Sequence, residues 1–415
     1  MTGCQPSHSK PKQAKLTQPN IIIIMTDDQG YADVSCYDHS KEVHTPHIDS
    51  IARAGVRFTN GYVSGIQCVP SRAGLLSGKY QQRYGLYSNK DIFDGGFRDQ
   101  ITLPQVLKKN GYATGMVGKW HLGRSVEKEK PYHRGFDKFY GFLQGMRGYL
   151  KYNAKRPLLR NGEPLKEKFG YLTDFFNREA VSYIDKHSSQ GPFFLYVSYN
   201  APHYPLEAKA EYLKKFNTGN PKRDAQLAMM ASVDEGVGQI IASLKKNGVY
   251  DNTLLFFLSD HGGETNKGAD NGVLRAGKNT LYEGGTRVPF LVSWPARVPS
   301  GKVSKSTVVS LDIFTTAVAA AKGDMPNDKI IDGKDLLPTI LGQTNVPLHE
   351  TLFWQQRENQ WALRHKNWKL INNGESFELY DLEKDIGEQH NIAANHSTIV
   401  AQLETLYTHW KKEMK

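Results

Sequence analysis

Short apolar runs followed by polar loops recur along the chain. The first run, 21–25, is rich in β-branched residues and precedes the polar segment 26–30. The same pattern is found at 113–117, 193–199 and 254–258, and each run leads into residues with charged, imidazole or amide side chains. A continuous apolar run of this length, bounded by turn residues, is typical of a buried strand in a parallel sheet. The pattern therefore predicts at least four such strands.

Segments with helical periodicity lie between these runs, at 46–54, 103–110, 175–187 and 226–247. Strands that alternate with helices predict an α/β fold, in which a large, mostly parallel sheet is sandwiched by helices. Ligands of such sheets bind beyond the carboxyl ends of the strands. Because all four runs end in polar residues, we expect an active site assembled at that edge from distant segments.

The pattern changes after about residue 345. Short strand-like pieces separated by turns are found at 352–354, 361–363, 368–371 and 378–381, and an amphipathic helix is expected at 398–412. These features predict a small antiparallel-sheet subdomain at the C-terminal end. The expected organisation is a flexible leader at 1–17, a catalytic domain at 18–345 and a C-terminal α+β subdomain at 346–415.

Composition narrows the classes of protein that remain. Hydrophobic residues make up 39% of the 415 residues and charged residues 23%, which excludes a mainly disordered or collagen-like chain. The apolar runs are far shorter than the ~20 residues that span a bilayer, so no transmembrane helix is expected. A formal net charge of +11 favours an anionic partner. Nucleic acid is not expected, because no helix-turn-helix, zinc or aromatic single-strand signature is present.

The three cysteines, Cys4, Cys36 and Cys68, are too few for a disulfide framework. Cys4 follows a small residue and precedes a polar stretch, as in a bacterial lipoprotein signal, although the apolar segment of such a signal is missing. Two interpretations stay open for Cys4. It is either a lipid-anchored junction, which indicates a periplasmic or extracellular protein, possibly at the outer membrane, or a chance cysteine in a tail. Cys36 is interpreted as an ordinary thiol.

Cys68 opens the most informative stretch, Cys-Val-Pro-Ser-Arg at 68–72. This stretch resembles the signature of type I sulfatases, members of the alkaline-phosphatase-like superfamily, in which the cysteine is oxidised to Cα-formylglycine by a separate installing enzyme. Residues 111–121 resemble the second signature of that family. Further matches follow the family's order at 27–28, 45–49, 259–262, 277–285 and 378–382. The resemblance implies the sulfatase fold and, in function, a bacterial carbohydrate sulfatase acting on a sulfated polysaccharide or oligosaccharide.

The chemistry of sulfate esters agrees with this resemblance. Hydrolysis requires a nucleophile aimed at sulfur, neutralisation of the sulfuryl oxygens and protonation of the departing alkoxide. A thiolate is poorly suited, because it would form a stable thiosulfate ester. A hydrated aldehyde carries two hydroxyls, so one can attack sulfur while the other later loses its proton and expels sulfate. Composition alone favours a buried structural thiol at Cys68, whereas the motif favours formylglycine.

The resemblance also implies a single calcium site. Taken alone, Asp27 and Asp28 would be turn or capping residues. Hard carboxylate oxygens suit calcium, whereas the nitrogen of His261 is a less usual ligand. Asp260 is in addition the expected base that takes a proton from the attacking hydroxyl. The implied metal ligands are Asp27, Asp28, the modified Cys68, Asp260 and His261.

Catalytic positions around the sulfate are implied in the same way. Arg72 and Lys119 are expected to orient the formylglycine hydrate. His203 and Lys278 are expected to face the ester oxygen, with His203 as the first choice of general acid. His121 is expected to assist proton removal in the second step. In isolation each would be a solvated charge or an ordinary histidine. The implied catalytic residues are Cys68, Arg72, Lys119, His121, His203 and Lys278.

A basic segment at 147–160 holds five cations and no acid. Guanidinium groups bind sulfate oxygens in bidentate fashion, and the tyrosines of the segment can stack on sugar rings, so a saccharide-binding lip is expected. A solvated basic loop is the alternative. The candidate substrate-binding residues are Arg147, Lys151, Arg156 and, close to Lys278 in the sequence, Arg275.

Three other functions remain open at this point. Arylsulfatases and phosphonate or phosphodiester hydrolases belong to the same superfamily and share formylglycine. A protein of another class, a polyanion-binding protein without turnover, would result if Cys68 were never converted. The complete set of reactive positions argues against that last interpretation.

Overall fold

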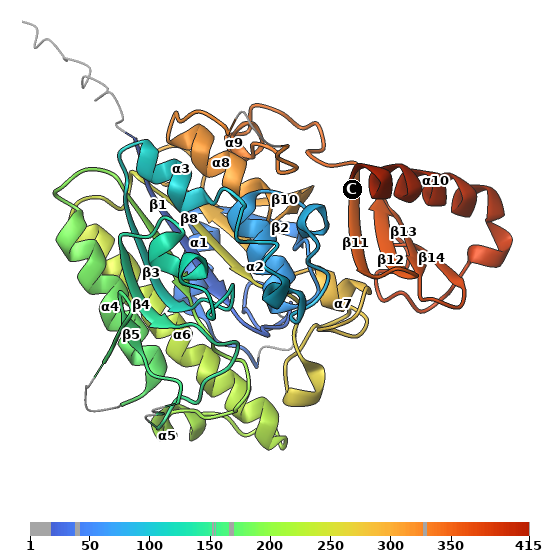
Figure 1. Ribbon diagram of the computed structural model, residues 1–415. Coiled ribbons are helices and arrows are strands. Elements are labelled where there is room, and N and C mark those ends of the chain that lie inside the picture. The colour runs from blue at the N-terminus through green and yellow to red at the C-terminus, as the bar shows by residue number, and fades with distance from the viewer. Residues whose placement is uncertain are drawn as a thin grey trace, which may run out of the picture.

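The computed structural model describes residues 18–37, 42–151, 153, 155–165, 170–326 and 330–414. The predicted leader and Cys4 lie outside these residues. Two sheets organise the molecule, one of ten strands and one of four. Figure 1 shows helices on both faces of the larger sheet, while the four-stranded sheet lies to one side with the last helix. This is the predicted α/β architecture with a small antiparallel sheet after it.

The ten strands follow the order β10-β2-β9-β8-β1-β7-β3-β4-β5-β6. The sheet is mostly parallel, but β9 runs antiparallel to both of its neighbours and β5 runs antiparallel to β4 and β6. The strands are β1 (Asn20–Thr26), β2 (Gly55–Tyr62), β3 (Ala113–Lys119), β4 (Lys138–Phe142), β5 (Leu159–Arg160), β6 (Glu163–Pro164), β7 (Phe193–Ser198), β8 (Thr253–Ser259), β9 (Phe290–Ser293) and β10 (Lys302–Val309).

The four apolar runs are confirmed as β1, β3, β7 and β8, and these strands are consecutive neighbours in the sheet. Every residue of β1 is buried, because alternate side chains enter different cores. Ile21 and Ile23 pack with α2 (Cys68–Ser77), α3 (Leu103–Lys109) and α8 (Asp312–Ala320). Ile22 and Ile24 pack on the other face with α1 (Pro46–Arg53), α4 (Leu172–His187) and α6 (Pro221–Lys246). Burial on both faces explains why the run is continuous rather than alternating.

The described helices include the four predicted in the larger domain. The longest, α6, starts five residues earlier than predicted, because the side chain of Asn220 caps its first turn and Pro221 takes the first helical position. The helices are α1 (Pro46–Arg53), α2 (Cys68–Ser77), α3 (Leu103–Lys109), α4 (Leu172–His187), α5 (Ala210–Leu213), α6 (Pro221–Lys246), α7 (Glu283–Thr286), α8 (Asp312–Ala320), α9 (Leu337–Ile340) and α10 (Ser397–Glu413).

Short 3-10 turns and the C-terminal sheet complete the fold. The 3-10 turns are η1 (Gln81–Tyr84), η2 (Asp91–Asp94), η3 (Glu127–Glu129), η4 (Pro131–His133), η5 (Thr265–Lys267) and η6 (Ala393–Asn395). The four predicted strand pieces form an antiparallel meander, β11 (Thr351–Arg357), β12 (Gln360–His365), β13 (Trp368–Asn372) and β14 (Phe377–Asp381). The helix α10 packs on this sheet, with the rings of Trp361 and Tyr407 stacked at 3.8 Å.

The C-terminal sheet shares a core with the larger one. Tyr62, Ile66 and Tyr80 pack in the same apolar cluster as the inner side chains of β11–β14 and α10. In the described part of the chain, no helix is both long and apolar enough to cross a bilayer.

Candidate active site

The neighbouring strands β8, β1, β7 and β3 run parallel, so their carboxyl ends meet at one edge of the sheet. The residues that follow these ends therefore lie close together although they are far apart in the sequence. Asp27 and Asp28 follow β1, and Lys119 is the last residue of β3. Asp260 and His261 follow β8, while His121 and His203 lie in the loops after β3 and β7.

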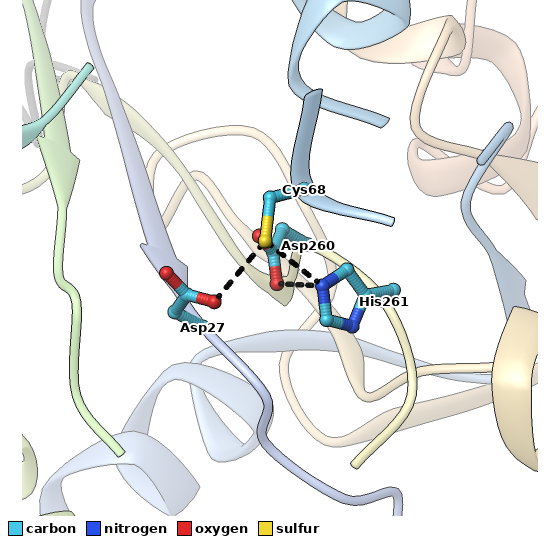
Figure 2. A group of neighbouring side chains, drawn as sticks. All are labelled: Asp27, Cys68, Asp260 and His261. Atoms are coloured by element: carbon cyan, nitrogen blue, oxygen red, sulfur yellow. Dashed lines mark hydrogen bonds and ion pairs between the residues drawn. The ribbon is translucent and has the colours of Figure 1, made fainter. Parts of the chain in front are cut away.

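Cys68 reaches the same edge from the first residue of α2. Arg72 lies one turn further along that helix, and both side chains are buried. In Figure 2 the sulfur of Cys68 points toward the side chains of Asp27, Asp260 and His261. It lies 3.7 Å from Oδ1 of Asp27 and 3.3 Å from Nε2 of His261.

The expected ligand residues form two overlapping groups of possible metal donors. Donor atoms of Asp27, Cys68, Asp260 and His261 all lie within 4.8 Å of one another. A second group with the same spacing joins Asp27 to Asp28 and His203. Among the described residues, Oδ2 of Asp28 is buried and accepts no hydrogen bond, although Nε2 of His203 is 3.7 Å away. The cluster therefore holds a buried carboxylate oxygen with unused capacity.

Three cations face these three carboxylates. Arg72 Nη2 lies 2.9 Å from Asp260 Oδ2 and 3.2 Å from Asp27 Oδ2. The ammonium of Lys119 pairs with Asp27 and also donates to Cys68 Sγ over 3.5 Å. Lys278 Nζ contacts Oδ1 of Asp28 at 2.7 Å, so each cation has a carboxylate partner.

These contacts set the protonation states. Burial would raise the pKa of Asp27, but Lys119, His203 and Arg72 outweigh it and hold that pKa well below its usual range. The pKa of Asp28 is lowered as well, since burial is outweighed by His203 and Lys278. Both aspartates are thus carboxylates at neutral pH, the form that binds a cation.

The histidines differ in environment. Burial, together with Lys119 and Arg72, lowers the pKa of His121 well below its usual range, so this imidazole is neutral. Burial also disfavours a charged His261, but the Asp260 carboxylate and the Cys68 sulfur raise its pKa to about 9. Nδ1 of His203 donates to the carbonyl oxygen of Tyr204 at 2.6 Å, so its Nε2 carries a proton only in the imidazolium form.

Gly145 makes the position of His121 possible. A Cβ atom on Gly145 would lie 2.3 Å from Nε2 of His121, closer than real side chains approach. His121 itself adopts a φ of 56°, in the left-handed region that favours glycine. The imidazole is therefore held in place by a close backbone approach as well as by burial.

A cavity of about 310 Å³ opens above Cys68. Four of the expected catalytic residues, Cys68, His121, His203 and Lys278, line it, while Arg72 and Lys119 lie beneath it. Loop residues form the rest of its wall. Of these, only Arg156 was expected to bind substrate. These wall residues are Asn89, Ile92, Phe93, Gly123, Arg124, Leu143, Gln144, Gly145, Met146 and Arg156.

The four expected substrate-binding residues are not brought together. Arg156 lines the cavity, and its Nη1 donates to the carbonyl oxygen of Met146 at 2.9 Å. Arg147 is buried, with 1% of its surface exposed. Lys151 is exposed and does not line this cavity.

Arg275 points instead to the C-terminal sheet. Its Nη1 donates to Oη of Tyr380 at 2.9 Å and to the carbonyl oxygen of Glu388 at 2.8 Å. The guanidinium also stacks over the ring of Tyr282 at 3.9 Å. These contacts hold together two parts of the fold and do not reach the cavity above Cys68.

Arg124 and Phe93 also line the cavity and were not predicted. Both lie in irregular or short 3-10 segments, which carry no apolar periodicity. A usable signal for Arg124 was present, however. It follows the second signature by only three residues, and the loop after β3 necessarily rises from the carboxyl edge of the sheet.

Comparison with known proteins agrees with this geometry. The sulfatase family model matches residues 19–323, and that of the C-terminal part of N-sulphoglucosamine sulphohydrolase matches 276–413. The uncharacterized sulfatase YdeN of Escherichia coli (strain K12) is 34% identical over 395 residues, covering 83% of this chain and 70% of that protein. The N-acetylgalactosamine-6-sulfatase of Mus musculus is 35% identical over 352 residues, covering 78% and 66%. The chain thus spans about two thirds of the length of these relatives.

Solved structures show the same similarity. Ps i-CgsB in complex with k-i-k-neocarrahexaose aligns with a TM-score of 0.90 and 36% identity, over 96% of this chain and 94% of that chain. The phosphonate monoester hydrolase of Agrobacterium radiobacter aligns with a TM-score of 0.74 over 96% of each chain. Its 19% identity shows a shared fold alone.

Proposed function

The chain belongs to the sulfatase family of sulfuric ester hydrolases, and we propose that it removes sulfate from a sulfated polysaccharide or oligosaccharide. Two of its relatives support a carbohydrate substrate by their names, one an N-acetylgalactosamine-6-sulfatase and the other solved with a neocarrahexaose. A polymeric saccharide would meet the enzyme in the periplasm or outside the cell, which is the location we propose.

One observation carries the proposal. The sulfur of Cys68 lies at the floor of a cavity, 3.5 Å from the ammonium of Lys119 and beside the carboxylate of Asp27. We propose that a separate installing enzyme converts Cys68 to formylglycine, so that Sγ marks the place of the formylglycine oxygen. The hydrated aldehyde supplies a hydroxyl that can attack sulfur and a second hydroxyl through which sulfate can be expelled.

The acidic cluster fits a calcium ion. Three buried carboxylates supply hard oxygen donors, and the unused Oδ2 of Asp28 is the kind of atom that a cation would satisfy. Asp27, Asp28, Asp260 and the converted Cys68 would hold the ion, with His261 as the least typical donor. A bound calcium ion would add positive charge facing the sulfuryl oxygens.

The remaining residues orient groups and move protons. Arg72 is fixed by Asp27, Asp260 and by Oγ of Ser198 at 2.5 Å, so its charge stays directed at the reacting group. We infer that Asp260 accepts a proton from the group at position 68, because one of its oxygens lies within 4.8 Å of Sγ of Cys68. The neutral imidazole of His121 is suited to accept a proton in the second step.

Protonation of the leaving alkoxide falls to His203 and Lys278. Both line the cavity, and each contacts the carboxylate of Asp28. His203 is the preferred acid, because an imidazolium gives up its proton more readily than an ammonium. We propose in addition that the chain divides into a catalytic domain at 18–345 and a C-terminal subdomain at 346–415.

The test is sulfate release from defined carrageenan, agar, ulvan, fucan and glycosaminoglycan oligosaccharides, with the position of desulfation assigned by NMR. The enzyme should be produced together with the installing enzyme. Phosphonate and phosphodiester substrates are measured under matched conditions. Turnover of these that exceeds sulfate release would contradict the proposal and favour the alternative hydrolase activity, and preference for a simple aryl sulfate would favour an arylsulfatase.

Two variants test the assigned roles. Cys68→Ala and Lys119→Ala should each lose turnover, by at least about 10²-fold for Lys119→Ala, while circular dichroism shows the fold retained. Lys138→Ala is the matched control. Lys138 is an exposed lysine at the first residue of β4, which runs parallel to β3, so it lies at the sheet edge away from the site. Activity retained in either site variant would show that the roles are assigned wrongly.

A further inference from the structure

The cavity above Cys68 is larger than a sulfate group requires. Its volume of about 310 Å³ lies at the lower end of small-molecule sites, which typically enclose about 300–1,000 Å³. The proposed catalytic residues occupy only its floor. The outer wall comes from three separate segments, the loop that includes η2, the loop after β3 and the loop between β4 and β5. That wall must contact the part of the substrate that does not react.

Two arginines give the outer wall positive charge. Arg124 and Arg156 both line the cavity, and none of its described lining residues is an acid. The acids on the loop of Arg124 are already neutralised, since Glu127 pairs with Lys130 at 2.5 Å and Glu129 with Arg98 at 2.7 Å. Within the part of the chain that the structure describes, no ion pair joins either arginine to a carboxylate. These two positive charges are therefore available to a ligand.

An aromatic ring lies beside this charge. Phe93 exposes 64% of its surface and lines the cavity, and the guanidinium carbon of Arg124 is 6.0 Å from the centre of its ring. Met146, 36% exposed, adds a second apolar side chain to the wall. Large exposed apolar side chains next to a site of defined chemistry indicate a binding surface. An apolar ring face next to guanidinium groups suits a pyranose that carries an anionic substituent.

We propose that Arg124 and Arg156, with Phe93, form a second anion subsite that binds a further negatively charged group on the same saccharide. This inference rests on the proposed sulfatase function and narrows its substrate class. The preferred substrate is an oligosaccharide with at least two anionic groups, one at Cys68 and one at the outer wall. A second sulfate and a uronate carboxylate share the required chemistry, because guanidinium groups bind both in bidentate fashion.

The test compares three disaccharides that share the sulfate to be removed: one with no further charge, one with a second sulfate and one with a uronate. For each enzyme the readout is a selectivity ratio, kcat/KM for a doubly charged disaccharide divided by kcat/KM for the singly charged one. We expect Arg124→Ala and Arg156→Ala each to lower this ratio about tenfold or more, and high salt to lower it in the unmodified enzyme. Arg178→Ala, at an exposed arginine on α4, is the matched control.

The outcomes are distinct. A fall confined to the second sulfate, or one shared by the uronate, supports the subsite and identifies the anion it accepts. An unchanged ratio for both anions overturns it. If no sulfate ester is turned over at all, the sulfatase proposal fails first, and the subsite is then tested by binding. In a Cys68→Ala background, the Kd of the disulfated disaccharide should rise about tenfold with Arg124→Ala, and an unchanged Kd would overturn the subsite.

Discussion

Individual atoms at the cavity floor decide which chemistry the site can perform. Asp27 and Asp28 are held as carboxylates by the cations around them, whereas the buried imidazole of His121 is held neutral. A site that combines ionised acids with a neutral base can bind a cation and accept a proton at the same pH. Both properties follow from burial and from the charged neighbours of these side chains. The same side chains exposed to solvent would have neither property.

Because Gly145 closely approaches His121, we predict that a larger residue at Gly145 lowers activity. In Gly145→Ala the added methyl group would overlap the imidazole ring, so His121 must move. We expect kcat to fall about 10²-fold, as for a displacement of a catalytic group by about 1 Å. Steady-state kinetics measure this. Gly170→Ala, which lies outside the cavity, is the control, because a Cβ atom there would come no closer than 3.7 Å to its neighbours. Equal kinetics in Gly145→Ala and the unmodified enzyme would contradict the assigned role of His121.

The elements that carry the site were largely predictable from the sequence, but their neighbours were not. Continuous apolar runs identified β1, β3, β7 and β8, because strands buried on both faces contain few polar residues. The strand β2 was missed, since its sequence includes Arg57, Thr59 and Asn60, which are only partly buried. The motif at 68–72 identified the residue at the cavity floor, Cys68. The outer wall depends on how three loops pack together, which neither periodicity nor spacing encodes.

Buried charges link the larger sheet to the C-terminal one. Lys369 on β13 donates to Glu283 at the start of α7 over 2.8 Å, and both side chains are fully buried. The backbone N–H of Glu283 donates to Oε2 of Glu388 at 2.7 Å, beyond β14. Lys278 lies in the loop just before α7. The C-terminal sheet therefore supports the loop that carries this proposed catalytic residue.

Glu388 gives a prediction about pH. Burial, reinforced by Glu283 and opposed by Lys369, raises the pKa of Glu388 to about 8. The folded chain therefore keeps a proton that the unfolded chain releases near its ordinary value of 4.5. Between these values the unfolded state binds fewer protons, so the free energy of unfolding falls as pH rises, by about 1.4 kcal/mol per pH unit for one group. Above the folded pKa this contribution is constant.

Glu388→Gln removes this dependence. Urea unfolding at a pH of about 5 and of about 8 should show the variant gaining stability relative to the unmodified chain as pH rises. Glu383→Gln is the control, because Glu383 is an exposed acid just after β14. A constant stability difference between Glu388→Gln and the unmodified chain at both pH values would contradict a protonated Glu388.

For the molecule as a whole, the structure shows where part of the net charge of +11 lies, which composition alone could not. At the floor, Arg72, Lys119 and Lys278 are matched by three aspartates. The outer wall has two arginines and, among its described residues, no acid. Positive charge thus increases from the floor to the entrance of the cavity, which suits an anionic saccharide arriving from solvent.

Calcium should connect the site to the stability of the whole chain. Because the ion would bind only the folded cluster, adding calcium at about 100 times its Kd should stabilise the fold by about 2.7 kcal/mol. Thermal unfolding should shift upward with calcium and return after chelation, with a smaller shift for magnesium, which demands a stricter geometry. Asp28→Asn should reduce the calcium shift, whereas an equal shift in Asp28→Asn would show that the ion binds elsewhere.

We predict that turnover depends on conversion of Cys68 to formylglycine. The most direct test measures sulfate release per mole of protein across preparations that differ in the fraction of Cys68 converted, with that fraction read by mass spectrometry of the peptide containing Cys68. We predict a rate proportional to the converted fraction that falls to zero when only the thiol is present. Sulfate release at the same rate from fully unconverted chain would show that formylglycine is not the nucleophile.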